Sequence, residues 1–186
     1  MKRLQRAALL SELAERLLDH DSWCGETHLQ KAVYILQELL HCPMGLKFIL
    51  YKHGTFSFDL RADLTAMRAD SLLERRVRAA GYGPSLAPTQ QAQSLRQRYP
   101  KALGRYEQQI RFVADTVGAK NVDELERLST ALYVTLTGPA GTSAEERAVK
   151  IHELKPHVTL DQARAAVAAV DELIEQADRQ GLLSEQ

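Results

Sequence analysis

Helix starts recur through the second half of the chain, and they constrain its fold more than any other feature of the sequence. Three of them combine a capping residue with Glu or Gln three positions later: Asn121 with Glu124, Ser143 with Glu146, and Thr159 with Gln162. Such a pair satisfies two of the backbone N–H groups that the first turn of a helix leaves without partners. Apolar residues at helical spacing follow each pair, so the sequence predicts amphipathic helices through residues 100–186.

The first part of the chain mixes helices with an extended segment. Apolar spacing predicts one helix over residues 2–18 and a second that starts at Thr27, where Gln30 completes a capping box. β-prone residues over 46–51 predict a short strand. A third helix is predicted over 57–69, because its first residue is a serine, which is a favourable N-cap.

A β-hairpin is predicted after the third helix. Its strands are residues 72–79 and 84–89, which flank a Gly-Tyr-Gly turn at 81–83. Three helices followed by a hairpin is the element order of a winged helix, in which the strand at 46–51 would pair with the hairpin. The helix at 57–69 would then hold the recognition position immediately before the wing.

We therefore expect an α+β fold that is mostly α. Residues 1–99 would form a winged-helix-like unit with a small β-sheet, and residues 100–186 a helical bundle packed on that unit. The chain has 186 residues, of which 45% are hydrophobic. This is enough apolar material for one core, so the two parts are expected to form one compact domain.

Several classes of protein are disfavoured. The sequence has no apolar run of about 18 residues and no signal-peptide pattern, which predicts a cytoplasmic protein without a membrane span. Gly-rich phosphate loops, G-x-S-x-G and H-E-x-x-H are missing, so neither an enzyme class nor a cofactor is predicted. Cys24 and His28 are separated from His41 and Cys42 by a helix about 20 Å long, which is too far for one zinc ion.

Charge is unevenly distributed, although the net charge is zero. Residues 1–110 carry 16 Lys and Arg against 11 Asp and Glu, whereas residues 111–186 carry 8 against 13. The basic excess is concentrated in residues 61–105, with nine basic and three acidic residues. Such an asymmetry favours an anionic partner for the basic part, or an attraction between the two halves of the chain.

Part of the basic excess lies on the third helix and the hairpin. The candidate residues for binding nucleic acid or a protein partner are Arg61, Thr65, Arg68, Arg75, Arg76 and Arg78. They can contact backbone phosphates, which would make binding strongly dependent on salt. The alternative is a solvated face on which the Arg stems cover apolar surface.

Three short phrases resemble a known family. They are Leu29-Gln30-Lys31 with Tyr34, the run YKHGTFSFDL at 51–60, and Lys155-Pro156-His157-Val158. In these phrases the chain is similar to the YwgA-like proteins, which are related to the SocA-like antitoxins with the Panacea domain. The resemblance spans about Leu4 to Leu173, and Thr55 stands where the family commonly has proline after glycine.

The resemblance implies a small cytosolic protein of bacterial or phage origin that binds another protein, either to neutralise a toxin or as an adaptor. The family-motif residues are Lys31, Tyr34, Tyr51, His53, Gly54 and Ser57. Lys31, His53 and Ser57 can bind an anion or a partner's backbone. The alternative is a structural network that holds the turn at Gly54, with Ser57 as the helix cap.

Two functional hypotheses follow from these observations. The first is a non-enzymatic cytosolic binding protein of the antitoxin or adaptor type, with a toxin or other protein as partner. The second is a winged-helix transcriptional regulator that binds nucleic acid, which requires the predicted arginines to share one exposed surface. The apolar helices after residue 101 can also present a homodimer face, or they can form ordinary core.

Overall fold

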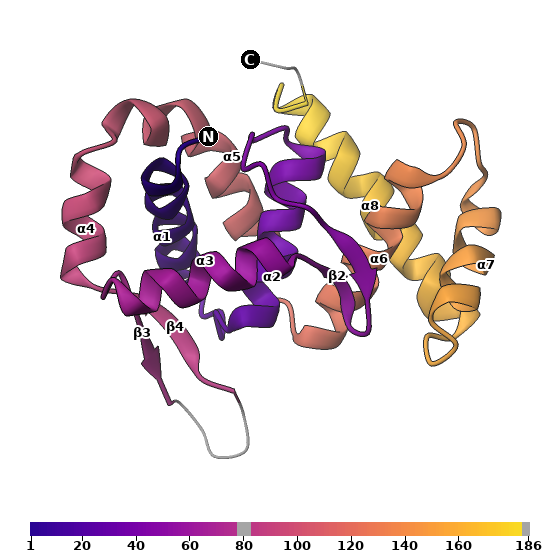
Figure 1. Ribbon diagram of the computed structural model, residues 1–186. Helices are drawn as coiled ribbons and strands as arrows, with labels where there is room; N and C mark the ends of the chain where they lie inside the picture. The colour runs from indigo at the N-terminus through magenta and orange to yellow at the C-terminus, as the bar shows by residue number, and fades with distance from the viewer. Residues whose placement is uncertain (78–82, 184–186) are drawn as a thin grey trace.

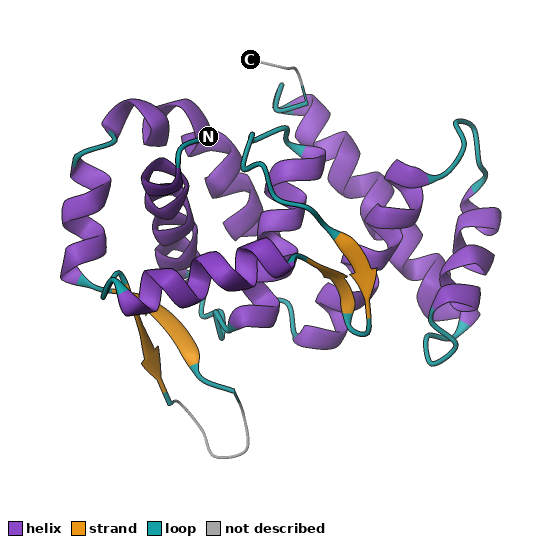
Figure 2. Ribbon diagram, viewed as in Figure 1, coloured by secondary structure: helices purple, strands orange, loops and turns teal. Residues whose placement is uncertain are grey.

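The computed structural model describes residues 1–77 and 83–183, and helices predominate in this part of the chain (Figure 1). The helices are α1 (Arg3–Asp19), α2 (Glu26–Tyr34), α3 (Phe58–Ala69), α4 (Gln90–Gln97), α5 (Pro100–Val117), α6 (Val122–Thr137), α7 (Ala144–Leu154) and α8 (Leu160–Arg179), and a π-helix, η1 (Ile35–Leu39), continues α2. Figure 2 shows two small hairpins, β1 (Ile49–Tyr51) with β2 (Gly54–Phe56) and β3 (Leu73–Arg76) with β4 (Ser85–Pro88). The prediction of a mostly helical α+β fold is confirmed.

One cluster of buried apolar side chains extends through the described residues from α1 to α8. α1 packs against α4, α5 and β4, while α6 packs against α7 and α8. α2 lies between these two groups and contacts α3, α5 and α6 (Figure 1). Leu29, Ala32 and Val33 of α2 are fully buried, so this helix is the centre of the fold. None of the helices in the described part is long and apolar enough to cross a membrane.

The helix starts predicted in the second half of the chain are confirmed. Asn121, Ser143 and Thr159 are the N-cap residues of α6, α7 and α8, and each forms a complete capping box. Ser57 caps α3, where its Oγ accepts a hydrogen bond from Leu60 N at 3.2 Å. These starts depend on contacts between residues three apart, and such contacts can be predicted from the sequence alone.

The predicted capping box of the second helix is wrong. α2 begins at Glu26 with Gly25 as its N-cap, and Thr27 lies inside the first turn. The Gln30 side chain bonds instead to the backbone of Ser57, donating to Ser57 O at 2.9 Å and accepting from Ser57 N at 2.8 Å. The N–H and C=O groups of Ser57 are buried. Leaving them without partners would cost more free energy of folding than leaving an accessible helix end without a side-chain cap.

The predicted pairing of the strand at 46–51 is also wrong. β1 pairs with β2 in an antiparallel hairpin, while β3 and β4 form a separate two-stranded sheet. The reason is local, because Gly54 has a φ of +83° and lets the chain reverse over Lys52 and His53. β1 therefore pairs with the segment that follows it immediately, and not with the later hairpin.

The predicted hairpin after α3 is present in the described residues. β3 and β4 are paired over all four residues of each strand, and residues 78–82, which include part of the predicted turn, lie outside the described part. The α1–α2 connection holds this hairpin along its β4 side. Leu86 N donates to Cys24 O at 2.9 Å, and Trp23 Nε1 donates to Gly83 O at 2.7 Å. In Figure 1 the hairpin projects away from the helices.

Candidate functional site

The three family-like phrases are far apart in the sequence, but they meet around one buried carboxylate, Glu126 of α6. Lys31 comes from α2, His53 from the β1–β2 hairpin, and Lys155 and His157 from the connection between α7 and α8. Glu126 is only 6% exposed. We call these five residues the Glu126 cluster.

Two buried lysines of this cluster hold the β1–β2 hairpin by its backbone. The Lys31 amine donates to Thr55 O at 2.9 Å, on β2. The Lys155 amine donates to Tyr51 O at 2.5 Å and to Lys52 O at 2.7 Å, at the end of β1. Because both amines bond to main-chain carbonyls, they position the hairpin and do not present free cations to a ligand.

Glu126 balances the positive charges of the cluster. Its carboxylate lies 3.7 Å from Lys155 Nζ, 3.2 Å from His157 Nε2 and 3.5 Å from His53 Nδ1. Burial lowers the pKa of Lys31 from 10.5 to about 8, with Glu126 opposing this shift and Lys155 adding to it. The His53 and His157 side chains are 66% and 62% exposed, so the cluster reaches the surface through its histidines.

α6 presents a buried polar face to the β1–β2 hairpin. Ser129 and Thr130 lie about one turn after Glu126 on this helix, and all three are buried. Gly54 lies so close to this face that a Cβ at position 54 would be 2.7 Å from Ser129 Oγ. The glycine of the family-like phrase is therefore needed for its positive φ and for its contact with α6.

Tyr34 and Ser57, two further family-motif residues, have internal roles. The Tyr34 ring packs edge-on against Phe48, with centroids 5.2 Å apart, and burial raises the pKa of its hydroxyl. Ser57 is fully buried and caps α3. Among the motif residues the side chains of Tyr51 and His53 are exposed, so a partner can reach the motif mainly through the β1–β2 hairpin.

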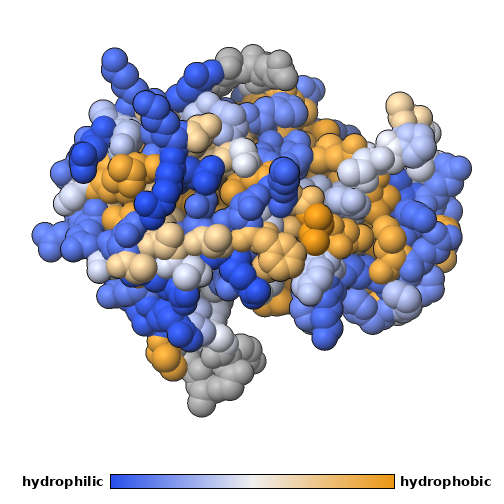
Figure 3. All heavy atoms as spheres, in the orientation of Figure 1, coloured by the Kyte–Doolittle hydropathy of each residue, from blue (hydrophilic) through white to orange (hydrophobic). Residues whose placement is uncertain are grey.

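The outer face of the β1–β2 hairpin and the start of α3 carry exposed aromatic side chains. Tyr51, Phe56 and Phe58 form a cluster with ring centroids 5.7, 5.8 and 5.0 Å apart. Tyr51 is 53% and Phe58 54% exposed. The Arg61 guanidinium lies 5.1 Å from the centroid of the Phe56 ring. We call these four residues the aromatic surface, and Figure 3 shows apolar side chains gathered near the centre of the face it displays.

A groove lies between the β3–β4 hairpin, α3 and the first turns of α2 and α6. Its volume is about 800 Å³. Three of the residues predicted to bind nucleic acid or a partner line it, namely Thr65, Arg68 and Arg75, together with Glu26, Lys120 and Asp123 from near the helix starts. The groove is thus the place where the structure brings part of the predicted basic face together.

The other predicted arginines lie elsewhere. Arg61 belongs to the aromatic surface, and its Nε donates to Glu26 at 2.8 Å. Arg76 pairs within its own strand, with the Glu74 carboxylate at 2.7 Å, because alternate strand residues share a face and Arg75 lies on the opposite one. Arg78 lies outside the described residues. The described arginines therefore do not form the single exposed surface that the nucleic-acid hypothesis requires.

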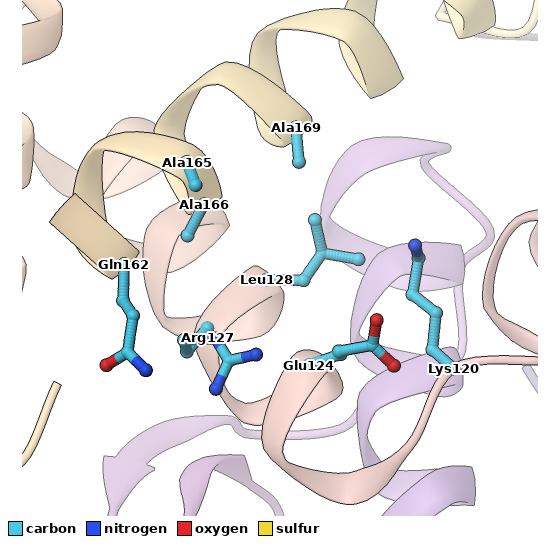
Figure 4. A pocket seen from close by; sticks show the side chains of 8 residues that line it. All are labelled: Lys120, Glu124, Arg127, Leu128, Gln162, Ala165, Ala166 and Ala169. Carbon is cyan, nitrogen blue, oxygen red and sulfur yellow. The ribbon is translucent and has the colours of Figure 1, made fainter.

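A second, smaller hollow of about 240 Å³ lies between α6 and α8 (Figure 4). Three alanines of α8 and Leu128 of α6 line it, and the small alanine side chains leave the space open. Lys120 also lines this hollow as well as the groove. None of the site residues predicted from the sequence lies here, so we do not assign it a role.

Glu126, Phe56 and Phe58 were not among the site residues predicted from the sequence, whereas Tyr51 and Arg61 of the aromatic surface were. The sequence does contain an indication of Glu126, because this charged residue is next to Leu125, the first residue of an apolar stripe. A signal for the aromatic surface was also present, since Tyr51, Phe56 and Phe58 fall within eight residues of a chain that has only 6% aromatic residues. The convergence of the three phrases, however, depends on tertiary structure.

No protein-family model matches the chain, and no curated protein sequence matches it significantly. Among the described residues, no group of three or more His, Cys, Asp or Glu side chains is arranged to hold a metal ion. Cys24 and Cys42 are buried, and burial raises the pKa of the Cys42 thiol to about 12. The candidate site is therefore defined by geometry: a rigidly held hairpin with aromatic side chains, beside a groove.

Proposed function

We propose that the chain is a non-enzymatic, cytoplasmic protein-binding protein of the antitoxin or adaptor type, and that it contacts its partner through the aromatic surface. The observation that carries this proposal is the exposure of two neighbouring aromatic side chains, Tyr51 on a hairpin that two buried lysines fix in place and Phe58 at the start of α3. Exposed clusters of large apolar side chains are typical of interaction sites.

The composition of the aromatic surface suits a protein partner. Binding energy at protein interfaces is concentrated in a few residues, and Tyr and Arg are enriched among them. Phe58 adds apolar area, and Arg61 extends the surface toward Glu26 at the edge of the groove. Because Lys31 and Lys155 already fix the hairpin backbone, little conformational entropy remains to be lost when a partner binds.

Removing two aromatic side chains should abolish this activity. In cells that also express the toxic product of a neighbouring gene, the wild-type chain is expected to restore growth, whereas the double variant Tyr51→Ala with Phe58→Ala is expected not to. The affinity for the purified partner should fall at least about 30-fold, because the loss of even one hot-spot residue costs about 2 kcal/mol or more. Both side chains are exposed, so the unfolding temperature should change by only a few degrees.

The control removes two exposed apolar side chains elsewhere. Leu136 and Val149 are 42% and 41% exposed, on α6 and α7. The double variant Leu136→Ala with Val149→Ala should therefore rescue growth as well as the wild type does. Equal rescue by both double variants would refute a role for the aromatic surface. A wild-type chain that neither rescues growth nor retains any neighbouring gene product would refute the antitoxin or adaptor proposal.

A second candidate function is nucleic-acid binding by a winged-helix-like unit. The observation that favours it is that Thr65 and Arg68 of α3 face the same groove as Arg75 of the hairpin that follows. A helix followed by a hairpin is the order in which a winged helix presents its recognition helix and wing. The carboxylates of Glu26 and Asp123 also line this groove, however, and they would repel phosphates, which is why we rank this candidate second.

A gel-shift titration separates the two candidates. If the groove binds phosphates, the double variant Arg68→Ala with Arg75→Ala should weaken binding about tenfold at low salt and reduce the salt slope by about 2. Removing Arg98 and Arg111, which are exposed on other parts of the chain, should have a smaller effect. Binding that does not change with salt, or that both double variants weaken equally, would exclude specific phosphate contacts in the groove.

A further inference from the structure

We infer that the groove between α3 and the β3–β4 hairpin binds a short acidic peptide segment with an apolar residue, supplied by the protein partner. This inference rests on the proposed function, since it assumes that the partner is a protein. It adds a second contact beside the aromatic surface and specifies the chemistry of the segment that is recognised.

Three cations of the groove are available to an acidic ligand. Among the described residues, Arg68, Arg75 and Lys120 form no ion pair with any carboxylate, and the Arg68 guanidinium has only a long contact of 3.4 Å to Thr65 Oγ1. The two carboxylates of the groove are Glu26 and Asp123. Glu26 is already paired with Arg61, at 2.8 Å, so the three cations exceed the carboxylates that remain unpaired in the groove.

The start of α2 adds to this excess. Gly25 is the N-cap of α2 and has no side chain that could accept from the first-turn N–H groups. The positive end of the helix therefore faces the groove without a side-chain cap, and it favours a carboxylate there. The start of α6 differs, because a capping box of Asn121 and Glu124 already satisfies its first turn. The start of α2 adds to the attraction that Arg68 and Arg75 exert on a carboxylate, but by itself it would not define a binding site.

Apolar side chains on the walls favour a peptide over a nucleic acid. Trp23, Leu64, Leu86 and Val122 line the groove alongside the charged residues, and Val122 is 49% exposed. These residues can accept one aliphatic side chain, while the arginines pair with carboxylates on either side of it. A phosphate backbone would leave the apolar wall without a partner and would meet the Asp123 carboxylate.

The chain carries its own reporter of this site. Trp23 is the only tryptophan in the sequence, and it lines the groove. We would titrate the full-length protein with the peptide acetyl-Glu-Asp-Leu-Glu-Asp-amide and record tryptophan fluorescence, with calorimetry as a second readout. The neutral peptide acetyl-Gln-Asn-Leu-Gln-Asn-amide has nearly the same shape and serves as the matched control.

The acidic peptide should bind at least about tenfold more tightly than the neutral one, and the difference should shrink as salt rises from about 50 to about 500 mM. The double variant Arg68→Ala with Arg75→Ala should weaken binding of the acidic peptide about tenfold. The double variant Arg98→Ala with Arg111→Ala loses the same charge from exposed positions outside the groove, and its affinity should stay within about twofold of the wild type.

Three outcomes would overturn the inference: no fluorescence or heat change at about 1 mM peptide, equal weakening by both double variants, or displacement of the peptide by a short single-stranded oligonucleotide or inorganic phosphate that binds more tightly. These outcomes are distinct from failure of the proposed function. If the aromatic double variant loses rescue but the acidic peptide does not bind, only the present inference fails. If the peptide binds but the chain neutralises no partner, the proposed function fails.

Discussion

Replacing Glu126 with alanine should destabilise the protein by about 3–5 kcal/mol, which is the usual cost of removing one partner from a buried group of charges. The variant would leave Lys31 and Lys155 in one buried region without their countercharge, and these residues are 2% and 6% exposed. Neither amine can turn into solvent without releasing the β1–β2 hairpin, because both donate to its carbonyls.

The loss of stability in Glu126→Ala should depend on pH, because Lys31 titrates differently in the folded and unfolded chain. Its pKa is about 8 in the folded protein against 10.5 in the unfolded chain. The unfolded chain therefore holds the proton more tightly, and the contribution of Lys31 to stability rises as pH increases through this window. Glu126 raises the pKa of Lys31, so its removal should lower that pKa further. The stability difference between wild type and variant should then shrink as pH rises toward about 8 and beyond, where Lys31 is increasingly neutral in both.

Urea unfolding at about pH 7 and about pH 9.5 tests both parts of this prediction. The control is Glu175→Ala on α8, where the carboxylate is 70% exposed and 3.8 Å from Arg179. We expect a change of less than about 0.5 kcal/mol for the control at either pH. A Glu126→Ala loss no larger than that of the control would show that the two lysines do not need a buried countercharge. A loss that grows with pH would contradict the role assigned to Lys31.

Helix starts were predictable because they are local. Asn121, Ser143 and Thr159 each bond to the residue three positions later, and no distant segment competes for them. Gln30 shows the opposite case. Its sequence context matches a capping box, but in the folded chain Ser57 supplies a buried N–H and a buried carbonyl that need the same amide. Sequence spacing contains no information on which of two such partners is nearer in space.

The hairpins show a similar limit. Pattern and turn residues predicted both the strand at 46–51 and the later hairpin, but not that β1 would pair with the three residues after Gly54. Three residues are too short for a periodic signal, and the turn depends on one backbone angle, the φ of +83° at Gly54. The β3–β4 hairpin could be predicted because its strands have four residues each, against three in β1 and β2, and because the sequence between them contains two glycines.

The candidate site was predictable only in part. The family-like phrases identified Lys31, Tyr51 and Gly54, and all three take part in holding or forming the β1–β2 hairpin. The position of Glu126 between the two lysines could not be predicted, because it requires α2, α6 and the α7–α8 connection to meet. Alternation along β3 separates Arg75 from Arg76, which a count of charges along the sequence does not reveal.

Replacing Gly54 with alanine should destabilise the protein by about 3 kcal/mol or more and displace the β1–β2 hairpin from α6. Two effects add in this variant. The positive φ of Gly54 alone costs about 1–2 kcal/mol for a residue with a Cβ. The new Cβ would also lie 2.7 Å from Ser129 Oγ and 3.3 Å from Glu126 O, distances at which the hairpin or the helix must move.

Gly141 provides a matched control for the first effect. Its φ is +80°, close to that of Gly54, but a Cβ at position 141 would have no neighbour within 4 Å. Gly141→Ala should therefore cost only about 1–2 kcal/mol, and the difference between the two variants measures the contact with α6. Thermal unfolding gives both values, and partner binding should be lost in Gly54→Ala alone, because that variant shifts the aromatic surface.

The close contact between a Cβ at position 54 and α6 can be tested by removing the nearest atom of α6. Ser129→Ala removes the atom nearest to the added Cβ, so the double variant Gly54→Ala with Ser129→Ala should recover about 1 kcal/mol relative to the sum of the single changes. Recovery is expected to be partial, since Glu126 O is main chain and cannot be removed. If the two changes are additive and Gly54→Ala costs no more than Gly141→Ala, then the hairpin does not depend on close packing against α6. The proposal that this packing fixes Tyr51 in position would then be wrong.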